Sequence, residues 1–371
     1  MIKKNKNRYV SRETLKKIDA RYVILLGHRS NGKSFSVKEL VIKNALEKGE
    51  EFAYIRRNKE DCKQYMIEEY FSDIICDSDG VRHLEEWSKG KYNAITVYQQ
   101  GIYFSNVDEN GKVKRGQQFG RMFGLSWATH YKSLSFPNIT TAIYEEFITD
   151  STGAFLNNEV KVFMNLISTI FRERRGTVYL VGNTLSRINP FFKEFNLKGI
   201  PKQRENSIEY YLYKYRDEKG KEHIERIAVY MTHSTNNNSG MFFGNSAKSI
   251  TSTVWETDEF PHLIGDIEDY EIIYTVVFEY DNNKFLLQFI KNPAGEHVWF
   301  ITPKTSDIQK GTRVISNQFR FDRYSTTLFK GLNEMEDKIF SFLKTDKIVY
   351  SDNLTATEFK QCYSMIRKFA L

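Results

Sequence analysis

The chain has 371 residues, a length that favours two or three domains and excludes a small disulfide-stabilised scaffold. Hydrophobic residues make up 40% and charged residues 27% of the chain, with only six prolines, which excludes a disordered or collagen-like protein. Its 54 lysines and arginines exceed its 47 aspartates and glutamates, and the net charge of +7 favours an anionic partner such as nucleic acid.

Three cysteines, Cys62, Cys76 and Cys362, lie far apart and form no Cys-x-x-Cys pair or Cys/His cluster. Such an odd set of separated thiols indicates neither a disulfide framework nor a zinc site, and it suits a reducing cytoplasm. Residues 1–8 are basic and polar, and the apolar run 22–27 is far too short to span a bilayer. We therefore expect no secretion signal and no contact with a membrane.

The first third of the chain alternates predicted strands and helices, which is typical of a parallel sheet. The apolar run 22–26 predicts a strand buried on both faces, and helical periodicity follows from about 35 to 48. A second short strand over 52–55 precedes a predicted helix over 60–75. From 94 to 126 the apolar period drops to two, with a turn signal at 108–112, which predicts a hairpin or meander.

Further elements continue this sheet and then change in character. Residues 140–144 predict a buried strand, 160–171 a helix and 178–181 another strand. Prolines and a polar segment indicate a connecting element with one hairpin further on. The last part predicts a meander (272–278, 285–290, 298–301), a helix (332–343), a strand (347–350) and a terminal helix (356–369). We expect three parts, namely residues 1–200, 201–265 and 266–371.

The strongest motif is the octapeptide Gly27-His-Arg-Ser-Asn-Gly-Lys-Ser34, which matches the Walker A pattern between a predicted strand and a predicted helix. Its glycines let backbone N–H groups surround a phosphate, Lys33 would reach the β- and γ-phosphates, and the Ser34 hydroxyl would bind Mg²⁺. The expected ATP-binding residues are Gly27, Ser30, Asn31, Gly32, Lys33 and Ser34. A Gly/Ser turn with a solvated lysine is the alternative interpretation.

Two carboxylates, Glu145 and Glu146, follow the predicted strand 140–144. We assign Glu145 to Mg²⁺, through its water shell, and Glu146 to the attacking water. Glu145 departs from the usual aspartate, and its extra methylene changes its reach to the ion. Alternatively, both carboxylates enter a solvated loop. Asn183, after the next predicted strand, would either sense the γ-phosphate or start a turn.

Arg172, Arg174 and Arg175 crowd the end of the predicted helix 160–171. Cations at a helix C-terminus are favoured by the helix dipole by roughly 0.3 to 1 kcal/mol, which is a sufficient structural explanation. The alternative is an arginine finger that enters a neighbouring subunit's site and stabilises charge on the transferred phosphoryl group. Arg174 and then Arg172 are the candidates for that role.

Other basic residues are candidates for binding anions. Arg56 and Arg57 follow the second strand, and they are either a solvated pair or contacts to phosphate or to a neighbouring subunit. Lysines in hairpins are often simply solvated, but several basic residues of the predicted hairpin and the loop after it are candidate contacts to a nucleic-acid backbone. These are Lys112, Lys114, Arg115, Arg121 and Lys132.

The order of these features resembles the DNA-encapsidation ATPases of small tailed phages of the picovirus type, relatives of the terminase large subunits. The resemblance is carried by the Walker A octapeptide, Tyr54-Ile-Arg-Arg57, the hairpin, Ile143-Tyr-Glu-Glu-Phe147, the arginine-ended helix and Val181-Gly-Asn-Thr184. These motifs cover roughly the first 200 residues, and the rest is similar by topology only.

The resemblance implies an α/β fold, with a P-loop NTPase domain of the ASCE, RecA-like type. It implies a homo-oligomeric ring at a procapsid portal in the host cytoplasm, where ATP and Mg²⁺ would drive double-stranded DNA inward. By this resemblance Lys33 and Ser34 contact phosphate and Mg²⁺, Glu146 is the catalytic carboxylate, and Arg172 or Arg174 is the finger.

The resemblance also bears on the last domain, because three strands, a helix, a strand and a helix begin an RNase H-like fold. In full terminases that fold carries an acidic metal cluster that cuts DNA. Here the available carboxylates are Glu279, Asp281 and Asp352, and both aspartates lie in turns where short polar residues are common. We favour a vestigial domain that does not cut and that docks to DNA, an RNA or the portal.

Two alternatives remain open. One is a terminase with an active metal-dependent nuclease. The other is a P-loop kinase or GTPase that acts on a small molecule.

Overall fold

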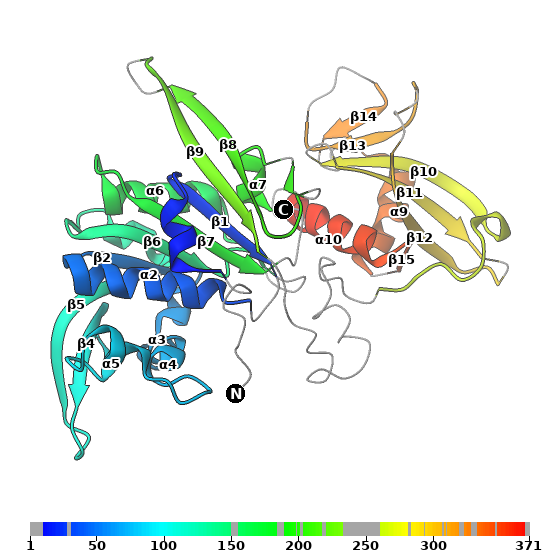
Figure 1. Ribbon diagram of the computed structural model, residues 1–371. Coiled ribbons are helices and arrows are strands. Elements are labelled where there is room, and N and C mark those ends of the chain that lie inside the picture. The colour runs from blue at the N-terminus through cyan, green and yellow to red at the C-terminus, as the bar shows by residue number, and fades with distance from the viewer. Residues whose placement is uncertain are drawn as a thin grey trace. The chain divides into compact units, whose positions relative to one another are not determined.

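The computed structural model describes residues 10–27, 31–149, 155–183, 189–197, 199–200, 203–216, 220–232, 260–280, 283–292, 294–305, 308, 310–318, 323–327, 332–345 and 347–367. The chain divides into two compact units, Met1–Val254 and Trp255–Leu371, whose elements are labelled in Figure 1. Among the described residues, no helix is both long enough and apolar enough to cross a membrane.

The first unit is built on a nine-stranded mixed sheet. In spatial order its strands are β3 (Ala94–Tyr98), β4 (Gly101–Val107), β5 (Val113–Gly124), β2 (Glu51–Arg56), β6 (Ile139–Glu145), β7 (Thr177–Asn183), β1 (Tyr22–Gly27), β9 (Glu222–Met231) and β8 (Ser207–Arg216). The strands from β5 to β9 in this order are parallel, and β3, β4 and β8 pair antiparallel at the two sides. The predicted largely parallel sheet and its hairpin are confirmed.

The parallel register brings the ends of three strands to one edge of this sheet. β1 is buried along its whole length, as its continuous apolar run predicts. Gly27 at its end lies beside Asn183 of β7, and Glu145 of β6 lies beside Val181 of β7. Residues that follow β1, β6 and β7 therefore meet at the carboxyl edge, which is where open α/β sheets bind ligands.

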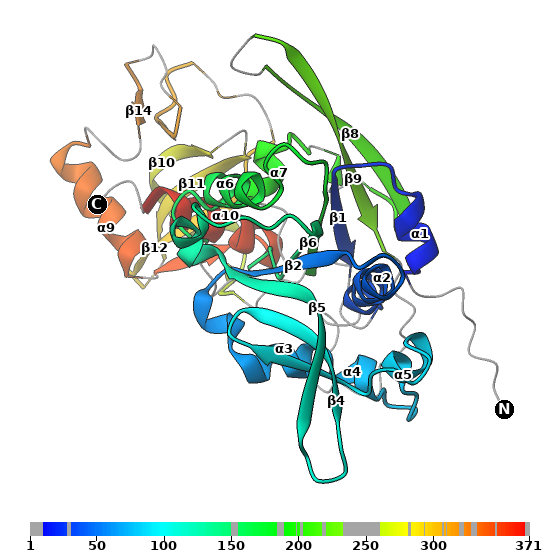
Figure 2. The same cartoon turned by 90° about the vertical axis from the view of Figure 1, so that its left-hand side faces the viewer.

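Helices α2 (Lys33–Lys48) and α6 (Glu159–Phe171) cover opposite faces of the sheet (Figure 2). On the face under α2, Val23 and Leu25 of β1 pack in one core with Val37 and Val41 of the helix. Burying side chains of this size contributes roughly 1.5 to 3 kcal/mol each, so this packing fixes where α2 begins. Shorter helices of the unit include α1 (Arg12–Lys17), η3 (Leu125–Tyr131) and α7 (Pro190–Glu194).

The single helix predicted over 60–75 is wrong. The structure has a short 3-10 helix, η2 (Lys59–Cys62), followed by α3 (Gln64–Tyr70) and α4 (Ser72–Ile75), and then by α5 (His83–Trp87). The helical run is interrupted at Phe71, whose fully buried ring packs edge-on against Phe52 and lies next to Phe119. Burial of this one aromatic ring therefore overrides the local helical pattern.

The hairpin in the predicted connecting element belongs to the first sheet instead. β9 pairs in parallel with β1, from Tyr22 beside Ile227 to Leu26 beside Met231, and β8 pairs antiparallel with β9. The first compact unit accordingly runs to Val254, and the expected boundary at residue 200 differs from it. The hairpin joins the first sheet because β9 pairs with the buried strand β1. Such long-range pairing leaves no local sequence signal.

The described residues of the second unit form a six-stranded sheet and two α-helices. Its strands, in spatial order, are β14 (Ser325–Thr327), β13 (Val314–Ser316), β10 (Glu271–Tyr280), β11 (Asn283–Lys291), β12 (His297–Pro303) and β15 (Ile348–Tyr350). Its helices are α9 (Glu334–Lys344) and α10 (Asn353–Arg367), and a single 3-10 turn, η5 (Ile267–Asp269), precedes β10. The predicted meander, helix, strand and helix are present, but the three-residue strands β13 and β14 were not predicted.

Candidate nucleotide site

The Walker A segment lies at the carboxyl edge of the first sheet, between β1 and α2. Gly27 has φ 149°, and a Cβ there would collide with the Thr232 hydroxyl and the Asn31 amide. Gly32 caps α2 with φ 80°, a left-handed conformation that glycine adopts without strain. Ser30, the other expected phosphate contact of the loop, lies outside the described residues.

The Lys33 side chain is almost fully buried at this edge. Its ammonium donates hydrogen bonds to the Gly27 carbonyl at 2.9 Å, to Asn31 Oδ1 at 3.0 Å and to Asn183 Oδ1 at 3.4 Å. Burial lowers the pKa of Lys33 to about 7, and the nearby Glu145 carboxylate opposes that shift. The structure therefore brings together Lys33, Asn31 and Asn183, as the sequence predicts.

Glu145 ends β6 beneath the start of α2. Its Oε2 accepts a hydrogen bond from the Ser34 hydroxyl at 3.3 Å, and its Oε1 accepts one from the Tyr70 hydroxyl at 2.7 Å. Burial raises the pKa of Glu145, and the two hydroxyl donors oppose that effect. Ser34 and Glu145 together present a hydroxyl and a carboxylate oxygen, which are the hard donors that Mg²⁺ prefers, so the donor set fits the ion.

Tyr70 is the member of this group that sequence reasoning missed. It ends α3, and its ring also lies 4.6 Å from the ammonium of Lys38, which pairs with Asp73 at 2.6 Å. A tyrosine at the end of a short helix carries no signal for such a contact, because its partner is far away in the sequence.

Glu146 lies in a different environment from Glu145. Its backbone is left-handed, with φ 54°, and its side chain is 67% exposed. Arg56 Nη2 donates to Glu146 Oε2 at 2.6 Å. Arg57 instead pairs with the buried carboxylate of Glu159 at 2.9 Å, so neither arginine is simply solvated.

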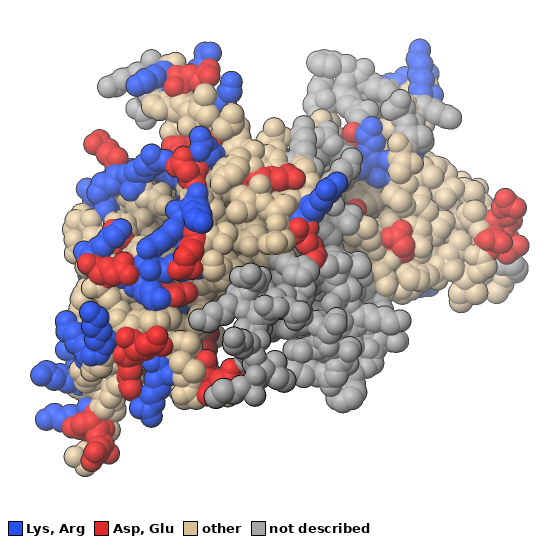
Figure 3. All heavy atoms as spheres, in the orientation of Figure 1, with Lys and Arg blue, Asp and Glu red and all other residues tan. Residues whose placement is uncertain are grey.

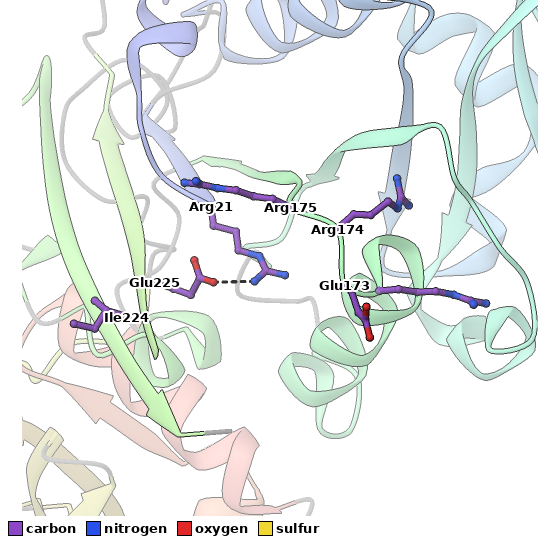
Figure 4. Close-up of a pocket in the computed structure, with 7 residues that line it drawn as sticks. Arg21, Glu173, Arg174, Arg175, Ile224 and Glu225 are labelled. Carbon is purple, nitrogen blue, oxygen red and sulfur yellow. Dashed lines mark hydrogen bonds and ion pairs between the residues drawn. The ribbon is translucent and has the colours of Figure 1, made fainter. Parts of the chain in front are cut away.

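Arg172, Arg174 and Arg175 follow α6 and precede β7, which places them at the amino end of β7. With Arg21, Glu173, Ile224 and Glu225 they line a cavity of about 400 Å³, shown in Figure 4. Arg174 donates four hydrogen bonds to the carbonyls of Phe136, Pro137, Ile139 and Ile170 at 2.6 to 2.9 Å. The exposed Arg172 donates a hydrogen bond to the Leu134 carbonyl at 3.1 Å.

The five candidate nucleic-acid contacts are not one cluster. Lys112, Lys114 and Arg115 are exposed on the β4–β5 hairpin, where the Arg115 guanidinium lies 4.1 Å from the Tyr98 ring centre. Arg121 lies within the sheet beside Ala53 and 3.8 Å from Glu51, and Lys132 is exposed after η3. Acidic and basic side chains are interspersed on the described part of this unit in Figure 3.

Of the carboxylates considered for a nuclease, the two that the structure describes, Glu279 and Asp352, do not converge. Glu279 lies on β10, and Asp352 follows β15, which is three strand positions away in the sheet. Three strand spacings separate the two strands by about 14 Å. Asp352 instead accepts bonds from the Thr355 amide at 2.8 Å and hydroxyl at 2.6 Å, as a cap of α10. Asp281 lies outside the described residues, among which no three His, Cys, Asp or Glu form a group that could hold a metal.

The fold and the site define a mixed α/β protein with a Walker A sequence at the carboxyl edge of a largely parallel sheet. The chain belongs to the Podovirus DNA encapsidation protein (Gp16) family, which it matches over residues 115–341, more than half of its length. The expected resemblance to phage DNA-encapsidation proteins is therefore confirmed.

Relatives and a solved structure agree with this assignment. The DNA packaging protein of Bacillus phage B103 is 31% identical over 204 residues, 53% of this chain and 54% of that protein. The DNA packaging protein of Bacillus phage phi29 is 29% identical over 175 residues, 47% and 46% respectively. The chain thus spans about half the length of the curated relatives it matches. A chain of the bacteriophage phi29 viral genome packaging motor assembly has the same fold, with a TM-score of 0.53, 20% identity and coverage of 97% of this chain and 100% of that one.

Proposed function

We propose that this protein is an ATPase that translocates double-stranded DNA into a viral procapsid, acting as a homo-oligomeric ring at the portal. The observation that carries the proposal is the meeting of Lys33, Ser34 and Glu145 at the carboxyl edge of the sheet. Membership of a DNA encapsidation family supports DNA as the substrate, and the relatives named above are DNA packaging proteins. Under this proposal the first unit is an ASCE, RecA-like P-loop domain and the second is a vestigial RNase H-like domain.

The site residues have separate tasks in this mechanism. Lys33 would contact the β- and γ-phosphates, whose negative charge favours the protonated ammonium and counteracts the effect of burial. Asn31 and Asn183, which accept from Lys33 through their side-chain oxygens, hold that ammonium at the carboxyl edge. Ser34 and Glu145 would hold Mg²⁺, which neutralises charge that develops on the phosphate oxygens.

Glu146 would orient and deprotonate the attacking water. Its carboxylate is exposed next to Arg56, so water can reach it, whereas Glu145 is buried and bonded to two hydroxyls. The two adjacent glutamates thus differ in environment, which is how neighbouring carboxylates take different roles. Among the basic residues, Arg172 is the better placed to act in a neighbouring subunit, because the Arg174 guanidinium already holds four carbonyls.

The Glu146→Gln variant tests the assignment. It should bind a fluorescent ATP analogue with Mg²⁺ as the wild type does, and its kcat should fall by at least about a hundredfold, because the general base is lost. Glu334→Gln is a suitable control, since Glu334 is an exposed glutamate paired with Lys338 at 3.0 Å in the second unit. Near-normal turnover by Glu146→Gln would remove the assignment, and absence of Mg²⁺-dependent ATP binding by the wild type would remove the ATPase.

The DNA part of the proposal has its own experiment. Double-stranded DNA should stimulate ATP hydrolysis, and neutralising Lys112, Lys114 and Arg115 together should weaken binding at low salt. Each lost phosphate contact should reduce the slope of log K against log salt by about 0.9. An unchanged slope would show that the hairpin does not contact DNA, and an absence of any DNA stimulation would favour a small-molecule kinase.

A further inference from the structure

The side chain of Glu159, the first residue of α6, is a fully buried carboxylate. Its Oε2 accepts from Arg57 Nε at 2.9 Å and from the Leu156 amide at 2.7 Å. Its Oε1 accepts from Arg57 Nη2 at 3.1 Å and from the Tyr144 hydroxyl at 2.6 Å. A buried ion pair requires such saturation, because an unpaired charge in the interior is strongly destabilising. Glu159 therefore fixes the plane of the Arg57 guanidinium.

The other contacts of that guanidinium are to the main chain that follows β6. Arg57 Nη1 donates to the Glu146 carbonyl at 3.2 Å, and Nη2 donates to the Phe147 carbonyl at 2.8 Å. Arg57 is thus held by α6 on one side and itself holds two consecutive carbonyls on the other. The Glu146 carboxylate pairs with the other arginine, Arg56.

The conformation of Glu146 explains what such a contact could do. A non-glycine residue with φ near 54° is disfavoured by roughly 1 to 2 kcal/mol, and it persists only where its surroundings hold it. The carbonyl of Glu146 and that of the next residue are the groups whose direction depends on this conformation. The left-handed residue also turns the Glu146 side chain away from the buried position of Glu145 and into solvent.

We infer that Arg57, oriented by Glu159, is a positioning residue that holds the main chain of Glu146 in its left-handed conformation and so aims the Glu146 carboxylate. This inference rests on the proposed role of Glu146 in hydrolysis. The two adjacent arginines at the end of β2 then divide the work: Arg56 contacts the Glu146 carboxylate, and Arg57 contacts its main chain.

The second unit contains a matched control for a purely structural role. Arg313 pairs with Glu336 through Nε at 2.8 Å and Nη2 at 3.0 Å, and the Tyr274 hydroxyl donates to the same carboxylate at 2.7 Å. Glu336 is buried in the first turn of α9, as Glu159 is in α6. Substitution of either glutamate removes the same kind of ion pair, but only the arginine paired with Glu159 also bonds the Glu146 carbonyl.

The experiment compares Glu159→Gln with Glu336→Gln in the full chain. Both should lower the melting temperature, and both should bind a fluorescent ATP analogue with Mg²⁺ within about twofold of wild type. Only Glu159→Gln should lower kcat, by about tenfold to a hundredfold with KM unchanged, because small misplacements of a catalytic group have effects of this size. Arg57→Lys should lower kcat in the same way, because a single ammonium cannot reach the carboxylate and both carbonyls. This variant tests the inference if Glu159→Gln does not fold.

The outcomes distinguish failure of this inference from failure of the proposed ATPase function. If Glu146→Gln abolishes turnover but Glu159→Gln and Arg57→Lys keep the wild-type kcat, the positioning role is overturned and the ATPase stands. Equal losses of kcat in Glu159→Gln and Glu336→Gln would also overturn it, since general destabilisation would then explain both. If the wild type hydrolyses no ATP, the proposed function and the inference fall together.

Discussion

The Tyr70 hydroxyl donates a 2.7 Å hydrogen bond to Glu145 Oε1, which leaves Oε2 to the Ser34 hydroxyl at 3.3 Å. A glutamate has one more rotatable bond than an aspartate, so it loses more side-chain conformational entropy when it binds a metal. Two hydroxyls on its two oxygens hold this carboxylate in one orientation. Tyr70 thereby compensates for the longer side chain at a position where an aspartate is usual.

Tyr70→Phe should weaken the Mg²⁺ dependence of nucleotide binding while the protein stays folded. Loss of a hydrogen bond to a charged group corresponds to roughly 1.5 kcal/mol, or about tenfold in the Mg²⁺ concentration that gives half-saturation. A titration of a fluorescent ATP analogue with Mg²⁺ measures it. Tyr274→Phe is the control, because the Tyr274 hydroxyl donates at the same 2.7 Å to Glu336 in the second unit. Equal Mg²⁺ dependence in the two variants would contradict the prediction.

Arg174 and Arg172 should differ in what their removal damages. Arg174→Ala leaves four carbonyls, in α6, in the loop before β6 and at the first residue of β6, without their donor, so we expect a loss of roughly 2 to 4 kcal/mol in the free energy of unfolding. Arg172→Ala removes one exposed hydrogen bond and should change stability by less than about 1 kcal/mol. Chemical denaturation of the two variants measures both values.

The same pair of variants tests action in a neighbouring subunit. If Arg172 is the finger, Arg172→Ala should reduce kcat by about a thousandfold in a stable protein. Mixing it with Glu146→Gln subunits should then restore some turnover, because an intact site can face an intact arginine across the interface. A stable Arg172→Ala variant with normal hydrolysis would leave Arg172 without that role.

The parts of the site that lie at strand ends could be predicted from the sequence. A buried apolar run followed by Gly27 to Ser34 indicates strand, loop and helix, and a second run followed by Glu145 indicates a neighbouring strand. Their meeting then follows from the geometry of parallel strands alone. The position of Asn183 beside Gly27 follows in the same way.

The partners of these residues could not be predicted. Tyr70 and Glu145 are 75 residues apart, and Arg57 and Glu159 are 102 apart. Periodicity shows which face of an element is buried, but it does not show which buried polar groups pair. The hairpin of β8 and β9 was predicted, but its place in the first sheet was not, because only its pairing with β1 makes it part of that sheet. Strands β13 and β14, of three residues each, were not predicted, because so few residues show no period.

Asp352→Ala should destabilise the protein without changing any DNA cleavage. Asp352 caps α10 through the Thr355 amide and hydroxyl, and loss of such a cap costs about 1 kcal/mol. Asp352→Asn should keep most of the stability, because an asparagine oxygen can also accept from the Thr355 amide. A plasmid-cutting assay with Mn²⁺ should show no difference among the three proteins, and cleavage that depends on Asp352 would revive the nuclease.

The stability contributed by Glu336 should depend on pH. Burial alone would raise the pKa of Glu336, but hydrogen bonds from the Asn333 amide, Tyr274 and Arg313 outweigh it and hold the pKa below its usual value. Since the folded state favours the ionised form, the contribution is complete above the ordinary glutamate pKa of about 4.3 and is lost as pH falls through the lower folded value. Glu336→Gln should therefore cost roughly 1.5 to 3 kcal/mol near neutral pH, and the difference from wild type should shrink progressively in acid.

Urea denaturation of the full chain at several pH values measures this difference. Glu334→Gln provides the control on the same helix, because the Glu334 side chain is exposed and pairs with Lys338 at 3.0 Å. Exposed ion pairs contribute little to stability, so this variant should track the wild type across the range. If the deficit of Glu336→Gln were the same in acid as at neutral pH, the ionised carboxylate would not be what stabilises α9, and the loss would come from packing or capping that survives protonation.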